Sequence, residues 1–158
     1  MRLTWQTALI CLSLSIEPAH ASSVTGTYIG KGGTAAFLLQ LIEASDGQLT
    51  GRYGQTLLID GLKLERMNAS VKGRSNDGLI VLEIKPPEVL SNTFVLSGSV
   101  TDSQLSLKGG GSGGSLNLSL EKAPEDEYQA QIAVLTKLAL KNASDSYLNK
   151  RLERQTLL

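Results

Sequence analysis

Residues 101–122 read TDSQLSLKGGGSGGSLNLSLEK, two short segments of alternating apolar and polar side chains joined by a run of glycines. In the second segment Leu116, Leu118 and Leu120 alternate with polar residues, which is the period of a β-strand with one buried face. The glycine run 109–114 invites comparison with phosphate-binding loops, but those loops open into a helix and usually supply a Lys, whereas a strand follows here. The stretch therefore predicts a β-hairpin with a flexible connection.

The same alternation extends over residues 24–121. Gly, Asp, Asn and Ser interrupt it at short intervals, and three of the interruptions place an Asp among residues that tolerate tight turns, at Asp46, Asp77 and Asp102. The pattern predicts a mainly β fold, an antiparallel up-and-down β-barrel or meander sandwich of about eight or nine strands, lipocalin-like in general shape. The expected strands are 24–29, 35–44, 48–54, 57–66, 69–74, 79–85, 92–100, 104–108 and 115–121.

Two features of these strands concern what fills and covers the barrel. The strand 37–42 is apolar on both faces apart from Gln40, so something must cover its outer side. Glycines that share the parity of the leucines point toward the interior, where they either let the strands coil tightly or leave space for a ligand. These glycines are Gly26, Gly51, Gly73 and Gly98.

Residues 123–158 are expected to form an amphipathic helical tail. Pro124 followed by three acidic residues is a typical helix start, because carboxylates near the N-terminus interact favourably with the helix dipole. Ser144 or Asp145 is expected to cap a second short helix after an interruption at 142–145. An apolar stripe on the first helix is the predicted partner-binding surface, facing either the barrel or another chain. The stripe consists of Tyr128, Ile132, Leu135, Leu138 and Ala139.

The first residues have the composition of a secretory signal peptide. Arg2 provides the positive start, the apolar stretch 8–16 is too short to span a bilayer, and Ala21 ends a small-x-small cleavage site. We therefore expect an exported, periplasmic or extracellular protein whose mature chain has no transmembrane segment. The expected organisation is a cleaved signal peptide at 1–21, an antiparallel β domain at 22–122 and a helical tail at 123–158.

The mature chain is chemically plain. Cleavage would remove Trp5, Cys11 and His20, the only residues of their types, so chemistry that needs a thiolate or an imidazole is excluded. The Asp residues sit singly in turns, without the density of a calcium-binding loop. We expect no metal site, no cofactor and no catalytic activity. The 15 basic and 15 acidic residues balance, which favours neither nucleic acid nor an anionic membrane as a partner.

Part of the chain resembles a known family. Gly26-Thr27-Tyr28, Gly33-Thr34 and residues 46–53, DGQLTGRY, are similar to the first hairpin of avidin and streptavidin, secreted eight-stranded up-and-down barrels that bind biotin. The resemblance covers about thirty residues and implies barrel geometry, with Thr34 and Tyr53 where that family places a hydroxyl and a tyrosine on the ligand. Gly30 stands where the family has an Asn, and the mature chain lacks the tryptophans that close the family's pocket, so biotin is not the expected ligand.

Three functions remain open at this level. The first is a non-catalytic binding module that engages a protein or envelope component, or itself, through the helical tail or an exposed strand edge. The second is a small-ligand carrier with an apolar barrel cavity, whose mouth would involve Tyr28, Thr34 and Tyr53. The third is a hydrolase that works with a pair of carboxylates from distant strands. The candidates for such a pair are Glu43, Asp60, Glu65 and Glu83.

Overall fold

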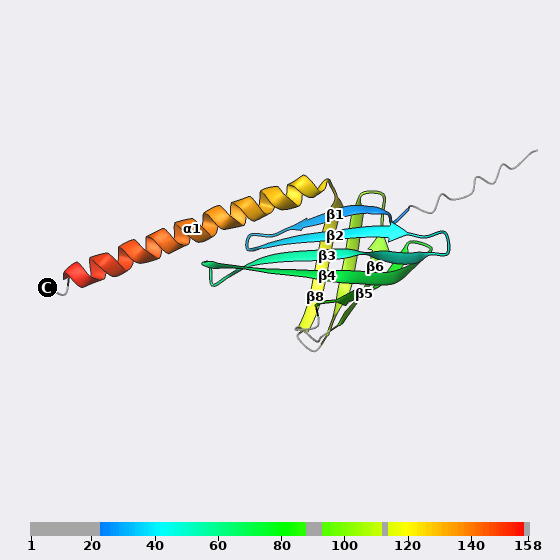
Figure 1. The fold of residues 1–158 in the computed structure, drawn as a ribbon, viewed down its shortest axis with the longest axis horizontal. Coiled ribbons are helices and arrows are strands. Elements are labelled where there is room, and N and C mark those ends of the chain that lie inside the picture. The colour runs from blue at the N-terminus through cyan, green and yellow to red at the C-terminus, as the bar shows by residue number, and fades with distance from the viewer. Residues whose placement is uncertain (1–22, 88–92, 112–113, 157–158) are drawn as a thin grey trace, which may run out of the picture.

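A computed structural model describes residues 23–87, 93–111 and 114–156, so the expected signal peptide at 1–21 lies outside the described residues. Eight antiparallel strands pair in sequence order and close into a barrel, and a single helix follows them (Figure 1). This confirms the predicted up-and-down barrel with a C-terminal helix. The elements are β1 Gly26–Lys31, β2 Ala35–Glu43, β3 Gln48–Ile59, β4 Lys63–Asn76, β5 Leu79–Lys85, β6 Phe94–Val100, β7 Gln104–Gly111, β8 Gly114–Lys122 and α1 Glu125–Thr156.

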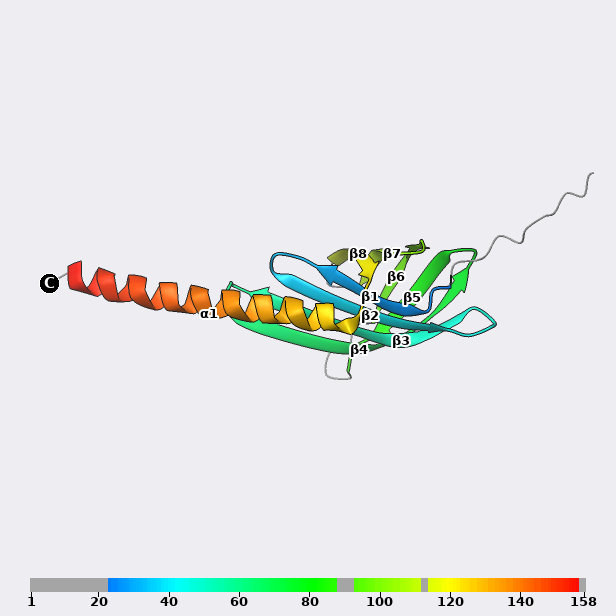
Figure 2. The ribbon, with the colours of Figure 1, turned by 90° about the horizontal axis from the view of Figure 1, so that it is seen from above.

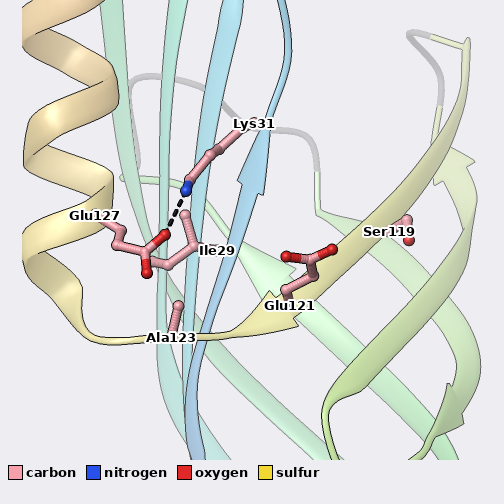
Figure 3. Close-up of a pocket in the computed structure, with 6 residues that line it drawn as sticks. All are labelled: Ile29, Lys31, Ser119, Glu121, Ala123 and Glu127. Carbon is pink, nitrogen blue, oxygen red and sulfur yellow. Dashed lines mark hydrogen bonds and ion pairs between the residues drawn. The ribbon is translucent and has the colours of Figure 1, made fainter.

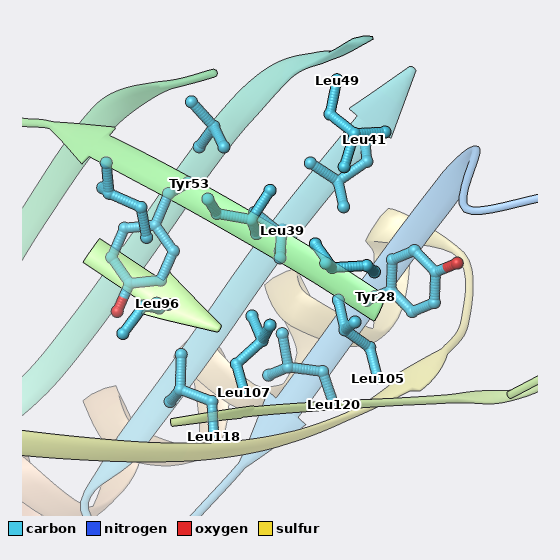
Figure 4. Close-up of a cluster of buried hydrophobic side chains, with 14 of the residues drawn as sticks. Tyr28, Leu39, Leu41, Leu49, Tyr53, Leu96, Leu105, Leu107, Leu118 and Leu120 are labelled. Carbon is cyan, nitrogen blue, oxygen red and sulfur yellow. The ribbon is translucent and has the colours of Figure 1, made fainter. Parts of the chain in front are cut away.

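The barrel interior is packed with apolar side chains from every strand (Figure 4). Tyr28, Leu39 and Tyr53 are register partners on three neighbouring strands, and each is at most 1% exposed. Alternation along each strand sends the leucines, isoleucines and valines inward, as the sequence pattern predicts. The core residues are Val24, Tyr28, Leu39, Leu41, Leu49, Tyr53, Ala69, Val71, Ile80, Leu82, Ile84, Leu96, Val100, Leu105, Leu107, Leu118 and Leu120.

Glycines at inward positions let the strands approach one another closely. A Cβ atom on Gly51 would overlap the carbonyl oxygen of Gln40 on β2, and one on Gly98 would overlap the carbonyl oxygen of Ser106 on β7. The backbone of the next strand thus occupies the space that a side chain would need. These glycines serve strand curvature, the first of the two roles considered from the sequence.

The turns explain why the barrel has eight strands and not nine. The predicted turns at Asp46, Asp77 and Asp102 all lie between strands, with Gly47 and Gly78 at φ values of 75° and 77°. The prediction of a strand over 57–66 is wrong, because the chain reverses at Asp60 and Gly61, both with positive φ. Leu62 N–H closes this turn on Ile59 O at 3.0 Å. The glycine-rich hairpin is also tighter than expected, since β7 continues to Gly111 and β8 begins at Gly114.

The helix α1 is continuous, and the predicted interruption at 142–145 is wrong. Asn142 does not break the helix, because its side-chain amide donates to the carbonyl of Gly61 in the β3–β4 turn at 2.8 Å. Lys141 and Asp145 form an ion pair one turn apart across the same segment, at 2.7 Å. Beyond Asn142 the helix projects past the barrel (Figures 1 and 2).

The first half of α1 covers the outer face of the strands from β1 to β4 (Figure 2). Ala36 and Leu38, outward residues of β2, are at most 3% exposed beneath it, whereas Ile42, farther along the same face of β2, remains 65% exposed. The hydroxyl groups of Tyr128 and Thr56 are 3.1 Å apart within this interface. Among the described residues, no helix has the length and apolar character needed to cross a membrane.

Candidate functional site

The closure of the barrel between β1 and β8 is short. In the part of the chain that the structure describes, the register between β1 and β8 consists of Tyr28 with Lys122 and Ile29 with Glu121, whereas β7 and β8 pair from Gly114 to Glu121. The N–H of Ala123 donates to Thr27 O at 3.0 Å at the closed end of this seam. Beyond Ile29 the two strands diverge, so the described part of β8 before Glu121 has no register partner on β1.

The backbone of β8 presents free hydrogen-bonding groups along the open part of the seam. The N–H of Lys122 donates to Ser103 O on the β7 side at 2.7 Å, and alternate residues of a strand turn their backbone groups to the same side. Even-numbered residues of β8 therefore bond to β7. The N–H and C=O groups of Ser115, Asn117 and Ser119 face the seam, where β1 does not pair with them.

A groove of about 240 Å3 lies in the open seam (Figure 3). Ile29 and Ala123 supply apolar surface, while Ser119 and Glu121 line the β8 side. On the helix side, Lys31 and Glu127 form an ion pair. The groove thus combines an unpaired strand edge with small apolar surface and charged rims.

The groove is separated from the barrel interior by Leu120. A Cβ atom on Gly30 would lie only 2.5 Å from Leu120 Cδ2, so the Leu120 side chain packs against the Gly30 backbone. Leu120 is fully buried, and Gly30 is buried as well. A ligand in the seam would therefore contact the outer edge of β8 and not the core.

The three predicted ligand residues do not form one pocket mouth. Tyr28 and Tyr53 are core residues, with hydroxyls that donate to Val24 O and Gln55 Oε1, both at 2.9 Å. Burial raises the pKa of both phenols, with Glu43 adding to the effect at Tyr28. Thr34 is exposed in the β1–β2 turn, where its carbonyl accepts from Leu58 N at 2.8 Å.

The predicted partner-binding stripe is occupied by the chain's own barrel. Tyr128, Ile132, Leu135 and Ala139 are 0–8% exposed against the outer faces of β1 to β4, and Leu138 packs at the edge of the same cluster. Four large apolar residues of α1 that face solvent lie elsewhere on the helix: Val134, Leu140, Tyr147 and Leu148.

The carboxylates considered from the sequence are dispersed. Glu43 accepts from Val24 N at 3.0 Å, Glu65 pairs with Lys63 at 2.9 Å, and Asp60 lies in the β3–β4 turn. Lys31, Ser119, Glu121 and Glu127 were not predicted from the sequence, because they are far apart along the chain and only the barrel closure brings them to one groove. Within the described ranges, no group of three His, Cys, Asp or Glu residues is placed to hold a metal ion.

Comparison with known proteins identifies no relative of this chain. No family model, no curated protein sequence and no solved structure matches the chain.

Proposed function

We propose that this chain is a non-catalytic exported binding module that captures an extended segment of a partner protein as an added strand at the free edge of β8. The observation that carries the proposal is the short closure of the barrel, with two register pairs between β1 and β8. Ser115, Asn117 and Ser119 offer three N–H and three C=O groups along the open seam. An edge of this kind is a template for β-strand addition.

The groove beside the edge suits a peptide in the extended conformation. Main-chain hydrogen bonds to β8 would supply affinity independent of sequence, and alternate side chains of the peptide would lie over Ile29 and Ala123. The charges of Lys31, Glu121 and Glu127 at the rim would then select among peptides. Export, on which the choice of an envelope or secreted partner depends, is inferred from residues 1–21 alone.

The packed interior favours edge binding over the small-ligand carrier. A carrier needs an apolar cavity of roughly 300 Å3 or more, whereas buried apolar side chains from all eight strands pack together in the core. The hydrolase alternative needs two carboxylates in one cleft, and those that share the groove are Glu121 and Glu127, which were not among the candidates from the sequence. Neither is desolvated, as a general acid requires, because Glu121 is exposed and the Glu127 side chain is 45% exposed and paired with Lys31.

A proline at position 119 tests strand addition directly. Ser119→Pro removes the N–H that faces the seam, and it disturbs no bond to β7 because that N–H points away from β7. Ser119→Ala is the matched control, since it keeps the N–H and loses only the exposed bond from Gln104 to the hydroxyl. We expect partners captured from the native envelope or secreted fraction to bind wild type and Ser119→Ala, but not Ser119→Pro.

Hydrogen exchange gives a second readout for the same site. The amides of Ser115, Asn117 and Ser119 should exchange fast in the free protein, and they should become protected when the partner binds. Equal binding by the proline variant, or protection on the helix with none on β8, would refute the edge as the site.

A further inference from the structure

We propose that the outer wall formed by β4, β5 and β6 docks on an anionic lipid surface. This wall lies away from the seam, and its function would be additional to strand capture. Its outward side chains combine exposed apolar residues with cations, which is the composition of surfaces that lie on membranes. The residues that carry the proposal are Lys72, Arg74, Leu79, Val81, Lys85 and Val95.

The exposed apolar residues of the wall lie on the adjacent strands β5 and β6. Leu79 and Val81 lie two residues apart on the same face of β5, and they are 66% and 51% exposed. Val95 on β6 pairs with Glu83, the next outward position of β5, and is 52% exposed. Three large apolar side chains on adjacent strands are therefore more than half exposed to solvent, and exposed apolar groups of this kind are typical of interaction surfaces.

Cations surround this apolar group. Arg74 is the register partner of Val81, and Lys72 is the register partner of Glu83. Among the described residues, Lys72, Arg74 and Lys85 take part in no ion pair. In the described part of the wall, Glu83 is the acidic neighbour of these cations on β5 and Asp77 lies in the turn between β4 and β5, so the wall keeps a net positive charge although the whole chain is balanced.

Two open hollows between the cations are large enough for a headgroup. One, of about 560 Å3, is bordered by Arg52, Lys85 and Pro86, and the other, of about 230 Å3, by Lys72, Glu83 and Lys85. Ser70 lines both hollows and adds a hydroxyl. A phosphate or carboxylate of a lipid headgroup would meet charge-assisted donors there.

The presence of exposed apolar residues beside the cations favours a lipid surface over a soluble polyanion as the occupant of the wall. A polyanion would use the cations and the hollows but would gain nothing from Leu79, Val81 and Val95. At a bilayer, the same three side chains enter the boundary between headgroups and acyl chains while the cations meet the phosphates. Both sets of residues are then accounted for by one occupant.

Vesicle binding of the full folded chain tests the proposal. We expect the protein to co-sediment with vesicles that contain anionic phospholipid, to bind vesicles of zwitterionic lipid weakly, and to release as salt rises. Replacing Lys72, Arg74 and Lys85 by Gln should lower partitioning by about a hundredfold, since each surface cation contributes about fivefold. Leu79→Ser with Val81→Ser should lower it by at least about tenfold.

Matched variants exclude nonspecific charge and apolar effects. Lys137→Gln with Arg151→Gln removes two exposed cations from the helix, and Val134→Ser removes an exposed apolar residue from it. These controls should bind vesicles within about twofold of wild type. The proposal is overturned if wild type ignores anionic vesicles, if the controls lose as much binding as the wall variants, or if soluble polyphosphate binds equally well and the apolar variants bind like wild type.

Discussion

The hydrogen bond between Tyr128 and Thr56 makes the docking of the helix measurable. Thr56 is fully buried and Tyr128 is 7% exposed, with their hydroxyl oxygens 3.1 Å apart. Tyr128→Phe leaves the Thr56 hydroxyl buried without its partner, which should lower the free energy of unfolding by about 2 kcal/mol. Thr56→Val leaves the Tyr128 hydroxyl, which lies nearer to water, and should cost about 1 kcal/mol.

The double variant separates this bond from simple loss of packing. When both hydroxyls are gone no polar atom is left unsatisfied, so the double variant should lose only about 1 kcal/mol and not the sum of about 3 kcal/mol. The coupling free energy would then be about 2 kcal/mol. Urea unfolding followed by circular dichroism measures all four proteins. If the losses add to within about 0.5 kcal/mol, the two hydroxyls do not interact and the helix is not seated as described.

Further predictions concern the tail, the interior glycines and alkaline pH. Deleting residues 125–158 should cause aggregation in gel filtration, because it exposes Ile29, Ala36, Leu38 and Leu58. Deleting only residues 143–158 should leave a soluble monomer of nearly unchanged stability. If the protein without residues 125–158 were soluble and equally stable, the helix would not be needed to cover these residues. Gly51→Ala should lower the free energy of unfolding by at least about 2 kcal/mol, because the new Cβ atom would overlap Gln40 O. Gly33→Ala should leave the free energy of unfolding unchanged, because no atom lies within 4 Å of the Cβ position. Equal effects of the two substitutions would contradict the close approach of β2 and β3. The phenols of Tyr28 and Tyr53 have folded-state pKa values above the ordinary value of about 10, so the unfolded chain releases protons first and stability should fall as pH rises beyond about 10. Tyr53→Phe should reduce that slope in pH-dependent unfolding, and Tyr147→Phe, which alters an exposed ring, should leave it unchanged.

The sequence predicts the barrel well because alternation and turn chemistry are local. The hairpins at Asp46, Asp77 and Asp102 carry an Asp beside residues suited to turns, and each was found where expected. The turn at Asp60 was missed because leucine and isoleucine flank it on both sides, so the apolar pattern runs through it. At 142–145, Asn142 bonds to Gly61 of the barrel and Asp145 pairs with Lys141 within the helix, so neither side chain ends the helix. Tertiary contact overrides local preference there.

The candidate surfaces could not be predicted from the sequence, because they depend on which strands meet. The seam arises from the register between the first and last strands, about ninety residues apart, and no local signal sets that register. The cluster of cations on the wall formed by β4, β5 and β6 also depends on strand pairing. Lys72 and Arg74 share one face of β4, and the pairing of β4 with β5 brings Lys85 and the exposed apolar residues of β5 to the same wall.

The position of the helix provides a physical reason for the open seam. After Lys122 the chain leaves β8 and begins α1 on the outer side of β1, where Glu127 pairs with Lys31. Ile29, the last residue of β1 in register with β8, packs against the helix cluster. The apolar contact and the ion pair both hold the end of β1 toward the helix, so β1 is not available to pair with Ser119 and the residues before it. Helix docking and the free edge of β8 are therefore one feature of the fold, and a change that releases the helix should also change the seam.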